Sequence, residues 1–148
     1  MKNTCIEVSI FAEKLYRLFL DIIKLELDAL SVADINGVQA LTLINIGNNT
    51  ITVGELTTKC YYTGSNASYN IKKMITNGYI IQKPAEHDKR SCYIKLSAKG
   101  VSLLEKLTNN LEKYYTVFSK NGDSKDILEK CVVVIKKINA TWKDFLVN

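Results

Sequence analysis

The chain has 148 residues, of which 47% are hydrophobic and 24% are charged. These values are ordinary for a globular protein, and the length suits one compact domain with a proper core rather than two. The formal net charge of +5 at pH 7 is compatible with a polyanionic partner but does not require one. No uncharged apolar run approaches the roughly 20 residues that a membrane span needs, so no membrane partner is expected.

The stretch from Ile6 to Leu30 is apolar but carries eight charged side chains, so it is neither a signal peptide nor a membrane helix. We therefore expect a cytoplasmic protein. The single histidine, His87, has no cysteine or histidine at a zinc-ligand spacing, which argues against a metal site. No cofactor is expected either. The four cysteines are far apart and are expected to be reduced thiols; they are Cys5, Cys60, Cys92 and Cys131.

The first predicted element is a long helix that ends near Leu30, followed by a helix from Gly37 to about Ile46. Phe19, Ile23 and Leu27 widen the apolar stripe of the first helix beyond what a monomer surface helix usually needs. The stripe itself has the three-and-four spacing of one helix face; it comprises Val8, Phe11, Leu15, Leu18, Ile22 and Leu25.

Two shorter helices are predicted next. Thr52 and Glu55 have the spacing of a capping box, which opens a short helix through Lys59. Another helix is expected from about Ser65 to Asn77, and Gly78 provides its left-handed C-terminal cap. The inner face of that helix comprises Ile71, Met74 and Ile75. Two short helices joined by a tight turn that contains glycine form a helix-turn-helix.

Two strand-like runs, Tyr79–Lys83 and Cys92–Leu96, are joined by a polar turn and predict a β-hairpin with an exposed tip. Ser97 caps a long helix that Asn121-Gly122-Asp123 breaks, and a last helix begins near Ser124. The predicted fold class is mainly α with a small β-hairpin. Residues 1–148 form a single domain, with a winged helix-turn-helix core at 33–97 and flanking helices at 5–31 and 98–147.

The flanking helices carry more apolar surface than a lone subunit of this size usually leaves exposed. Burial between two copies of the chain is the economical explanation, so we expect these helices to mediate a homodimer. The alternative is a six-helix monomer that wraps its own ends.

Five motifs follow one another in the central part of the chain. They are Ile35-Asn36-Gly37-Val38-Gln39-Ala40-Leu41, Val53-Gly54-Glu55-Leu56, the run from Asn66 to Ile80, Asp88-Lys89-Arg90-Ser91, and Leu96-Ser97-Ala98-Lys99-Gly100. In this order they resemble the start of helix two, the start of helix three, the recognition helix, the wing signature and the start of helix five in the MarR family of winged-helix regulators. The tyrosine-rich run from Tyr61 to Asn70 resembles in particular the alphaproteobacterial branch that includes the LdtR-type regulators.

The resemblance implies a transcriptional regulator, of a family that includes repressors, that binds double-stranded DNA at a pseudo-palindromic operator. Its recognition helix would present polar side chains to the major groove. Asn66 suits adenine, and Lys72 and Lys73 suit phosphates. The full set expected at the DNA is Thr63, Ser65, Asn66, Ser68, Tyr69, Lys72 and Lys73. The alternative is a merely solvated helix face.

The resemblance also gives the predicted hairpin tip a role. In the family the wing arginine enters the minor groove, where a narrow A·T tract attracts a guanidinium. This role falls to Arg90, which Asp88 would hold through a salt bridge, while His87 and Lys89 would contact the DNA backbone. The alternative is an ordinary ion pair in a turn.

The sequence suggests two modes of regulation. The resemblance implies a small aromatic or phenolic effector between the flanking helices and the winged core, with Phe19, Ile23 and Thr42 as candidate contacts. The alternative is that these three side chains are plain core residues. A redox sensor of the same fold is a second possibility, and among the thiols only Cys60, beside Lys59, suggests an electropositive setting.

An enzyme is not expected, because the only histidine lies on a predicted loop tip and no glycine-rich phosphate loop is present. A winged helix that binds another protein is a further alternative. No carboxylate occurs from Thr63 to Ala85, which favours DNA over that reading.

Overall fold

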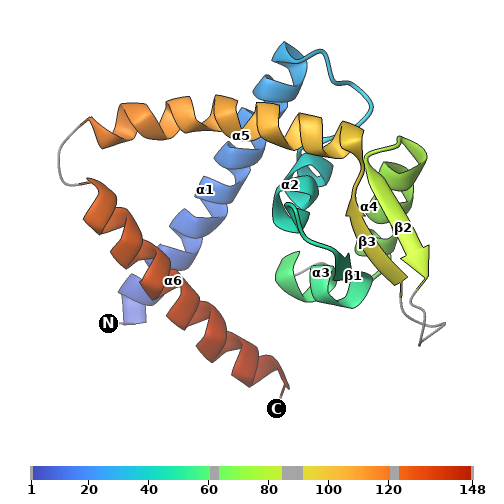
Figure 1. Cartoon of the computed structure of the whole chain (residues 1–148). Coiled ribbons are helices and arrows are strands. Elements are labelled where there is room, and N and C mark those ends of the chain that lie inside the picture. The colour runs from blue at the N-terminus through green and yellow to red at the C-terminus, as the bar shows by residue number, and fades with distance from the viewer. Residues whose placement is uncertain (1, 61–63, 85–91, 121–123, 148) are drawn as a thin grey trace. The chain divides into compact units, whose positions relative to one another are not determined.

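The computed structural model describes residues 2–60, 64–84, 92–120 and 124–147. In chain order the described elements are α1 (Lys2–Ala29), α2 (Gly37–Ile46), β1 (Ile51–Thr52), α3 (Val53–Cys60), α4 (Gly64–Thr76), β2 (Ile80–Pro84), β3 (Cys92–Leu96), α5 (Ala98–Ser119) and α6 (Ser124–Val147) (Figure 1). The chain divides into two compact units, Met1–Asn110 and Leu111–Asn148, and α5 runs from the first into the second. The prediction of a mainly helical winged fold is confirmed.

Local signals explain where several helices begin or end. Asn36 caps α2 by accepting a hydrogen bond from the Gln39 backbone, and Gly47, with φ +57°, ends that helix. Gly78 follows α4 with φ +79°, as expected for a left-handed cap. Ser97 Oγ accepts from the Gly100 backbone N–H at 3.1 Å, which caps the first turn of α5.

The sheet has three strands in the order β1-β3-β2, and both pairings are antiparallel. In the β2–β3 pair, Ile80 lies opposite Leu96 and Pro84 lies opposite Cys92. The sequence predicts the first strand of this hairpin one residue too early, at Tyr79–Lys83 instead of Ile80–Pro84. It does not predict β1, which adds Ile51 and Thr52 beside Ile94 and Tyr93. Pro84 is tolerated in β2 because this strand is an edge of the sheet.

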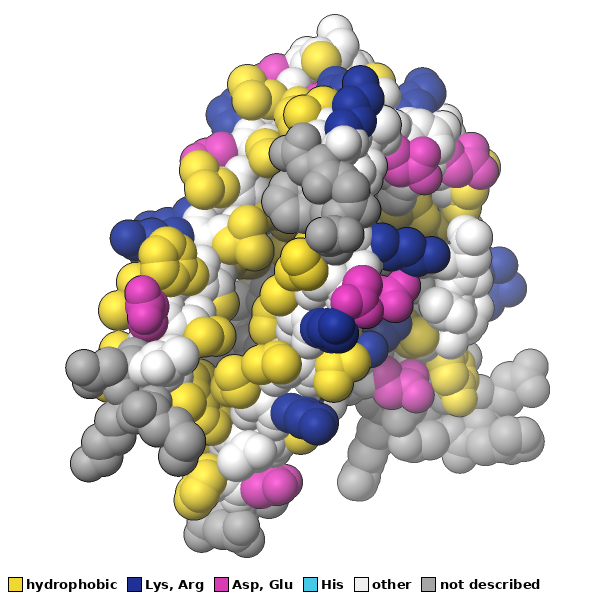
Figure 2. Space-filling model, turned by 90° about the vertical axis from the view of Figure 1, so that its left-hand side faces the viewer, with side chains coloured by type: hydrophobic (Ala, Val, Ile, Leu, Met, Phe, Trp, Pro, Cys, Tyr) yellow, Lys and Arg dark blue, Asp and Glu magenta, His cyan; other side chains and the backbone are white. Residues whose placement is uncertain are grey.

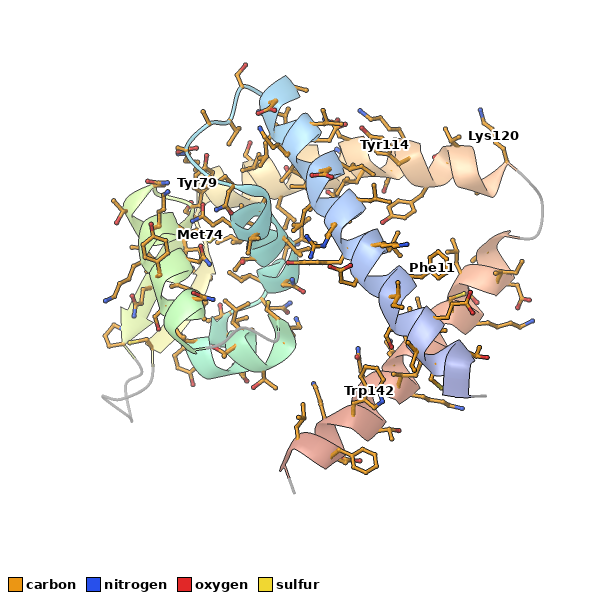
Figure 3. The ribbon with its side chains drawn as sticks, turned by 180° about the vertical axis from the view of Figure 1, so that it is seen from behind. Phe11, Met74, Tyr79, Tyr114, Lys120 and Trp142 are labelled. Atoms are coloured by element: carbon orange, nitrogen blue, oxygen red, sulfur yellow. The ribbon has the colours of Figure 1, made fainter. Side chains whose placement is uncertain are left out.

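The hydrophobic core of the first unit lies among α1, α2, the helix-turn-helix, the sheet and the first half of α5. Met74 from α4 and Tyr79 beyond its end both belong to this core (Figure 3). Its fully buried side chains include Ile23, Leu43, Ile46, Leu56, Met74, Ile94 and Leu107. At roughly 1.5–3 kcal/mol for each large apolar side chain, this cluster is sufficient to fix the relative positions of the elements that it joins.

The apolar residues of α1 divide between the core and the surface of the chain. Ile23 and Leu27 are buried and Phe19 is half-buried, so the residues expected to widen the stripe are the ones that meet the core. By contrast, Phe11, Leu15 and Leu18 of the expected stripe are 59–65% exposed. Periodicity identifies apolar positions on a helix, but it does not tell which of them the same chain covers.

The second unit, Leu111–Asn148, is rich in exposed apolar side chains. Figure 3 shows Trp142 on α6, where this side chain is 50% exposed. The exposed large apolar residues of α6 are Ile127, Leu128, Val132, Val133, Val134, Ile135, Trp142, Phe145 and Leu146. None of the helices in the described part of the chain combines the length and hydropathy that crossing a membrane requires.

Candidate nucleic-acid interface

The helix-turn-helix consists of α3 and α4, and its first helix is fixed by the predicted capping box. Thr52 Oγ1 accepts from the Glu55 backbone N–H at 3.1 Å, and Glu55 Oε2 accepts from the Thr52 backbone N–H at 2.6 Å. The hydrogen bonds from the backbone and hydroxyl of Thr52 hold the pKa of Glu55 below its ordinary value. Leu56, one residue on, is fully buried and anchors α3 to the core.

The second helix, α4, has one buried and one exposed face. Ala67, Ile71 and Met74 are buried, so the remaining positions face away from the core. The exposed side chains include all five of the predicted contacts that can be placed, namely Asn66, Ser68, Tyr69, Lys72 and Lys73. Tyr69 is 65% exposed, although a tyrosine usually buries most of its ring.

The remaining predicted DNA contacts cannot be placed. Ser65 belongs to α4, but its side chain lies outside the described part of the structure, and Thr63 lies outside the described residues altogether. The same holds for the four predicted wing-tip residues, His87, Asp88, Lys89 and Arg90. They belong to the segment that connects the paired strands β2 and β3.

A polar cluster joins the segment before α2 to the end of α4 and the start of α5. Asp34 accepts from the Tyr79 hydroxyl at 2.7 Å and from Lys99 Nζ at 2.9 Å. Lys99 also donates to the Asn77 carbonyl at 2.8 Å and lies 3.9 Å from the centroid of the Tyr79 ring. Asn77 Nδ2 in turn donates to the Asp34 carbonyl. These contacts join the C-terminal end of α4 to the segment before α2 and to the first turn of α5.

The charges in this cluster stabilise one another. Partial burial raises the pKa of Asp34, but the hydrogen bonds from Tyr79 and Lys99 and the positive charge of Lys99 outweigh it. The pKa of Asp34 therefore lies below its ordinary value. The hydrogen bond to Asp34 is the main reason that the pKa of Lys99 is raised.

A second polar link reaches the middle of α4 from the N-terminus of α2. Gln39, which is 1% exposed, donates from Nε2 to Asn70 Oδ1 at 3.0 Å. Its Oε1 accepts from the Asn36 backbone N–H at 3.1 Å, which completes a capping box. We did not predict a role for Asn70 from the sequence. The three-residue spacing of Asn36 and Gln39 is the signal that indicates the cap, although it does not indicate its long-range partner.

The three candidate effector contacts lie in the first unit. Ile23 and Thr42 are fully buried, and Phe19 is half-buried against the core. The Thr42 hydroxyl donates to the Val38 carbonyl at 2.9 Å, within its own helix. The effector role of these three residues stays a prediction.

The cysteines are free thiols in the structure. Burial raises the pKa of Cys60, and the opposing effect of Lys59 is smaller. Cys60 therefore lacks the lowered pKa of a reactive thiol.

Among the described residues, no group of three or more His, Cys, Asp or Glu side chains is arranged to hold a metal ion.

Comparisons with known proteins agree with this geometry. A sequence model described as MarR family matches residues 33–91. The chain is 32% identical over 139 residues to the exopolysaccharide II synthesis transcriptional activator ExpG of Rhizobium meliloti. This alignment covers 94% of the present chain and 72% of ExpG. The relative is thus named as a regulator of transcription and not as an enzyme.

Solved structures with this fold include AbsC, a MarR family transcriptional regulator of Streptomyces coelicolor, with a TM-score of 0.74, 14% identity and 93% of both chains covered. A mutant of MarR from E. coli complexed with operator DNA has a TM-score of 0.71 at 19% identity, with 92% of this chain and 96% of that chain covered. The motifs, the winged helix-turn-helix and the similarity to ExpG together show that this chain belongs to the MarR family.

Proposed function

We propose that the chain is a transcriptional regulator that binds double-stranded DNA sequence-specifically as a homodimer. One observation carries the DNA-binding part. The exposed face of α4 combines amide, hydroxyl and lysine side chains and has no carboxylate. Such a face suits phosphates and base edges and does not suit an apolar or basic protein partner. The solved MarR complex with operator DNA supports this assignment.

The side chains of α4 divide by their chemistry into two kinds of contact. Lys72 and Lys73, on the exposed face, suit phosphates, which give affinity and salt dependence. Asn66, Ser68 and Tyr69 suit base edges, which give specificity. Arg90 keeps its proposed minor-groove role on the ground of the Asp-x-Arg-Ser motif alone.

The homodimer is supported by the apolar side chains that a single chain leaves exposed. They occur on α1, on the second half of α5 and along α6. Figure 2 shows hydrophobic side chains, in yellow, exposed among charged ones. A two-fold dimer would present two copies of α4 to two half-sites of a pseudo-palindromic operator.

The proposal includes modulation by a small aromatic or phenolic compound. It rests on Phe19, a half-buried aromatic ring, near a core that also buries the Thr42 hydroxyl. A compound that binds there would shift the equilibrium between DNA-binding and non-binding states by its difference in affinity for the two. A thermal-shift panel of phenolic acids tests this directly, with Phe19→Ala as the variant that should lose the response.

The DNA-binding part is tested by fluorescence anisotropy with a duplex from the intergenic region upstream of the gene, at several salt concentrations. We expect selective binding that weakens steeply with salt, because lysine contacts release counterions from the phosphates. Lys72→Ala should weaken binding to all duplexes and reduce the salt slope by about one ion. Arg90→Ala should weaken binding to the selected duplex by about 1–3 kcal/mol.

Lys106→Ala is the matched control for the lysine variant, because Lys106 is an exposed lysine on α5 and not on α4. It should leave both affinity and salt slope unchanged. Weak, non-selective binding that neither Lys72→Ala nor Arg90→Ala alters would contradict the proposal and favour a protein partner.

A further inference from the structure

The carboxamide of Asn70 is held by a chain of hydrogen bonds that starts at a backbone group. The Asn36 backbone N–H donates to Gln39 Oε1 at 3.1 Å, and Gln39 Nε2 donates to Asn70 Oδ1 at 3.0 Å. Gln39 is almost completely buried, so water does not compete for these bonds. The chain of bonds joins the N-terminus of α2 to the middle of α4.

The first hydrogen bond of this series determines which group donates and which accepts in the bonds that follow it. A backbone N–H is only a donor, so the Gln39 atom that it meets must be the carbonyl oxygen. The other end of the Gln39 carboxamide is then its NH₂ group, which can only donate. Asn70 must therefore turn its oxygen toward Gln39 and its own NH₂ group away from it.

Asn70 lies on the same strip of α4 as two candidate DNA contacts. Asn66 is one turn before it and Lys73 is three residues after it, and both side chains are exposed. Asn70 is half-buried between them. Within the described ranges, its Nδ2 group donates no hydrogen bond, whereas its Oδ1 is occupied by Gln39.

We propose that Asn70 is a further DNA-contacting residue, which Gln39 holds with its NH₂ group toward a hydrogen-bond acceptor of the bound duplex. The inference rests on the proposed DNA-binding function and deepens it. Because its oxygen is turned toward Gln39, Asn70 does not present its oxygen and its NH₂ group together to adenine, as the bidentate pair requires. Its target is a phosphate oxygen or a base acceptor. Gln39 is a positioning residue, since it acts through Asn70.

Two substitutions at position 70 test the contact while both residues of the α2 capping box, Asn36 and Gln39, stay in place. Asn70→Ala removes the donor and should weaken DNA binding about three- to tenfold, the effect of one neutral hydrogen bond. Asn70→Asp keeps an acceptor for Gln39 but places a negatively charged oxygen toward the duplex. It should weaken binding by more than Asn70→Ala does. An equal loss for selected and unrelated duplexes identifies a phosphate, and a loss confined to the selected duplex identifies a base.

A substitution at Gln39 tests the orientation. Gln39→Glu keeps an acceptor for the Asn36 N–H but removes the donor to Asn70, which must then turn its NH₂ group inward. Binding should weaken as much as in Asn70→Ala. Added to Asn70→Ala, the same substitution should cause no further loss, because its effect passes through Asn70. The measurement is made at about pH 8, since a protonated carboxyl could still donate.

Asn109→Ala, at an exposed asparagine of α5, is the matched control and should bind like the wild type. Thermal unfolding establishes whether each variant is folded. If Gln39→Glu does not fold, the two variants at position 70 are sufficient to test the contact with DNA. Wild-type affinity in both Asn70→Ala and Asn70→Asp, beside a loss in Lys72→Ala, would overturn this inference and leave the proposed function intact. Absence of selective binding by the wild type would overturn both.

Discussion

Gly100 occupies a position where a side chain has no room. A Cβ atom there would collide with the carbonyl oxygen of Tyr79 and would lie 3.3 Å from the Cβ atom of Leu96. Gly100→Ala should therefore push the first turn of α5 away from the sheet. We expect a loss of about 1–3 kcal/mol in the free energy of unfolding, the usual range for overpacking, measured by urea denaturation.

Gly54→Ala is the control for this prediction. Gly54 lies in α3, and among the described residues a Cβ atom there would meet only Thr52 Oγ1, at 3.9 Å. Alanine is the better helix former, so this variant should gain roughly 0.5–1 kcal/mol. Similar effects of the two substitutions would contradict the steric explanation for Gly100.

Asp34 gives the stability a specific pH dependence. The pKa of Asp34 is lowered in the folded state, so its carboxylate stabilises the fold above the unfolded-state value of about 3.9. That contribution is lost as the pH falls through the lower, folded-state pKa. Asp34→Asn should lower the free energy of unfolding by up to about 1 kcal/mol at neutral pH, since the ion pair with Lys99 is half-exposed. The difference from the wild type should shrink below about pH 4.

Asp28→Asn provides the comparison, because Asp28 forms an exposed pair with Lys24 at four residues' spacing on α1. Such pairs contribute about 0.3–0.5 kcal/mol, so its effect on thermal unfolding should be the smaller of the two. A constant difference between Asp34→Asn and the wild type down to acid pH would show that the carboxylate charge is not what matters.

The sequence was sufficient to predict the exposed side chains of α4 but not the residues that support them. Ile71 and Met74 define the inner face, so Tyr69 and Lys72 had to face outward, and both do. Asn70 was missed because its partner Gln39 is 31 residues away, and a single sequence does not show such a pairing. The cluster around Asp34 was missed for the same reason.

At the scale of elements, the capping box of α3 combines two roles. Thr52 caps the helix and also pairs with Tyr93 as part of β1. Thr52→Ala removes the side-chain acceptor and should lower the free energy of unfolding by about 1 kcal/mol. Thr58→Ala is the control, because the Thr58 hydroxyl only donates back to Gly54 of the same helix. Equal effects of the two variants in thermal unfolding would argue against the cap.

Elements with strong local signals were predicted well, and those that depend on tertiary contacts were not. The helices follow from apolar periodicity together with caps such as Asn36, Ser97 and Gly78. β1 has only two residues, and it exists because β3 offers an edge for Ile51 and Thr52 to pair with. α1 carries two neighbouring sets of apolar side chains, and periodicity alone does not tell which of them meets the core of the same chain.

At the scale of the whole molecule, the exposed apolar surface of the helices supports the proposed homodimer. Phe145 and Leu146 of α6 are 78% and 75% exposed, and Val117 of α5 is 69% exposed. Apolar surface of this extent is uncommon on monomers and typical of an interface between subunits. A closed two-fold dimer is the simplest assembly that covers one such surface with a second copy of itself.

Light scattering on a sizing column tests the dimer, with an expected mass of twice the 16.7 kDa of one chain. Phe145→Glu places a charge in the proposed interface, where burial without a partner costs several kcal/mol, so it should shift the protein toward monomer. Its DNA affinity should fall as well, because each monomer then binds only one half-site. Lys137→Glu changes an exposed lysine of the same helix and should leave the protein dimeric. A wild-type monomer at micromolar concentration would refute the proposed assembly, while loss of the dimer in Phe145→Glu alone would identify α6 as part of the interface.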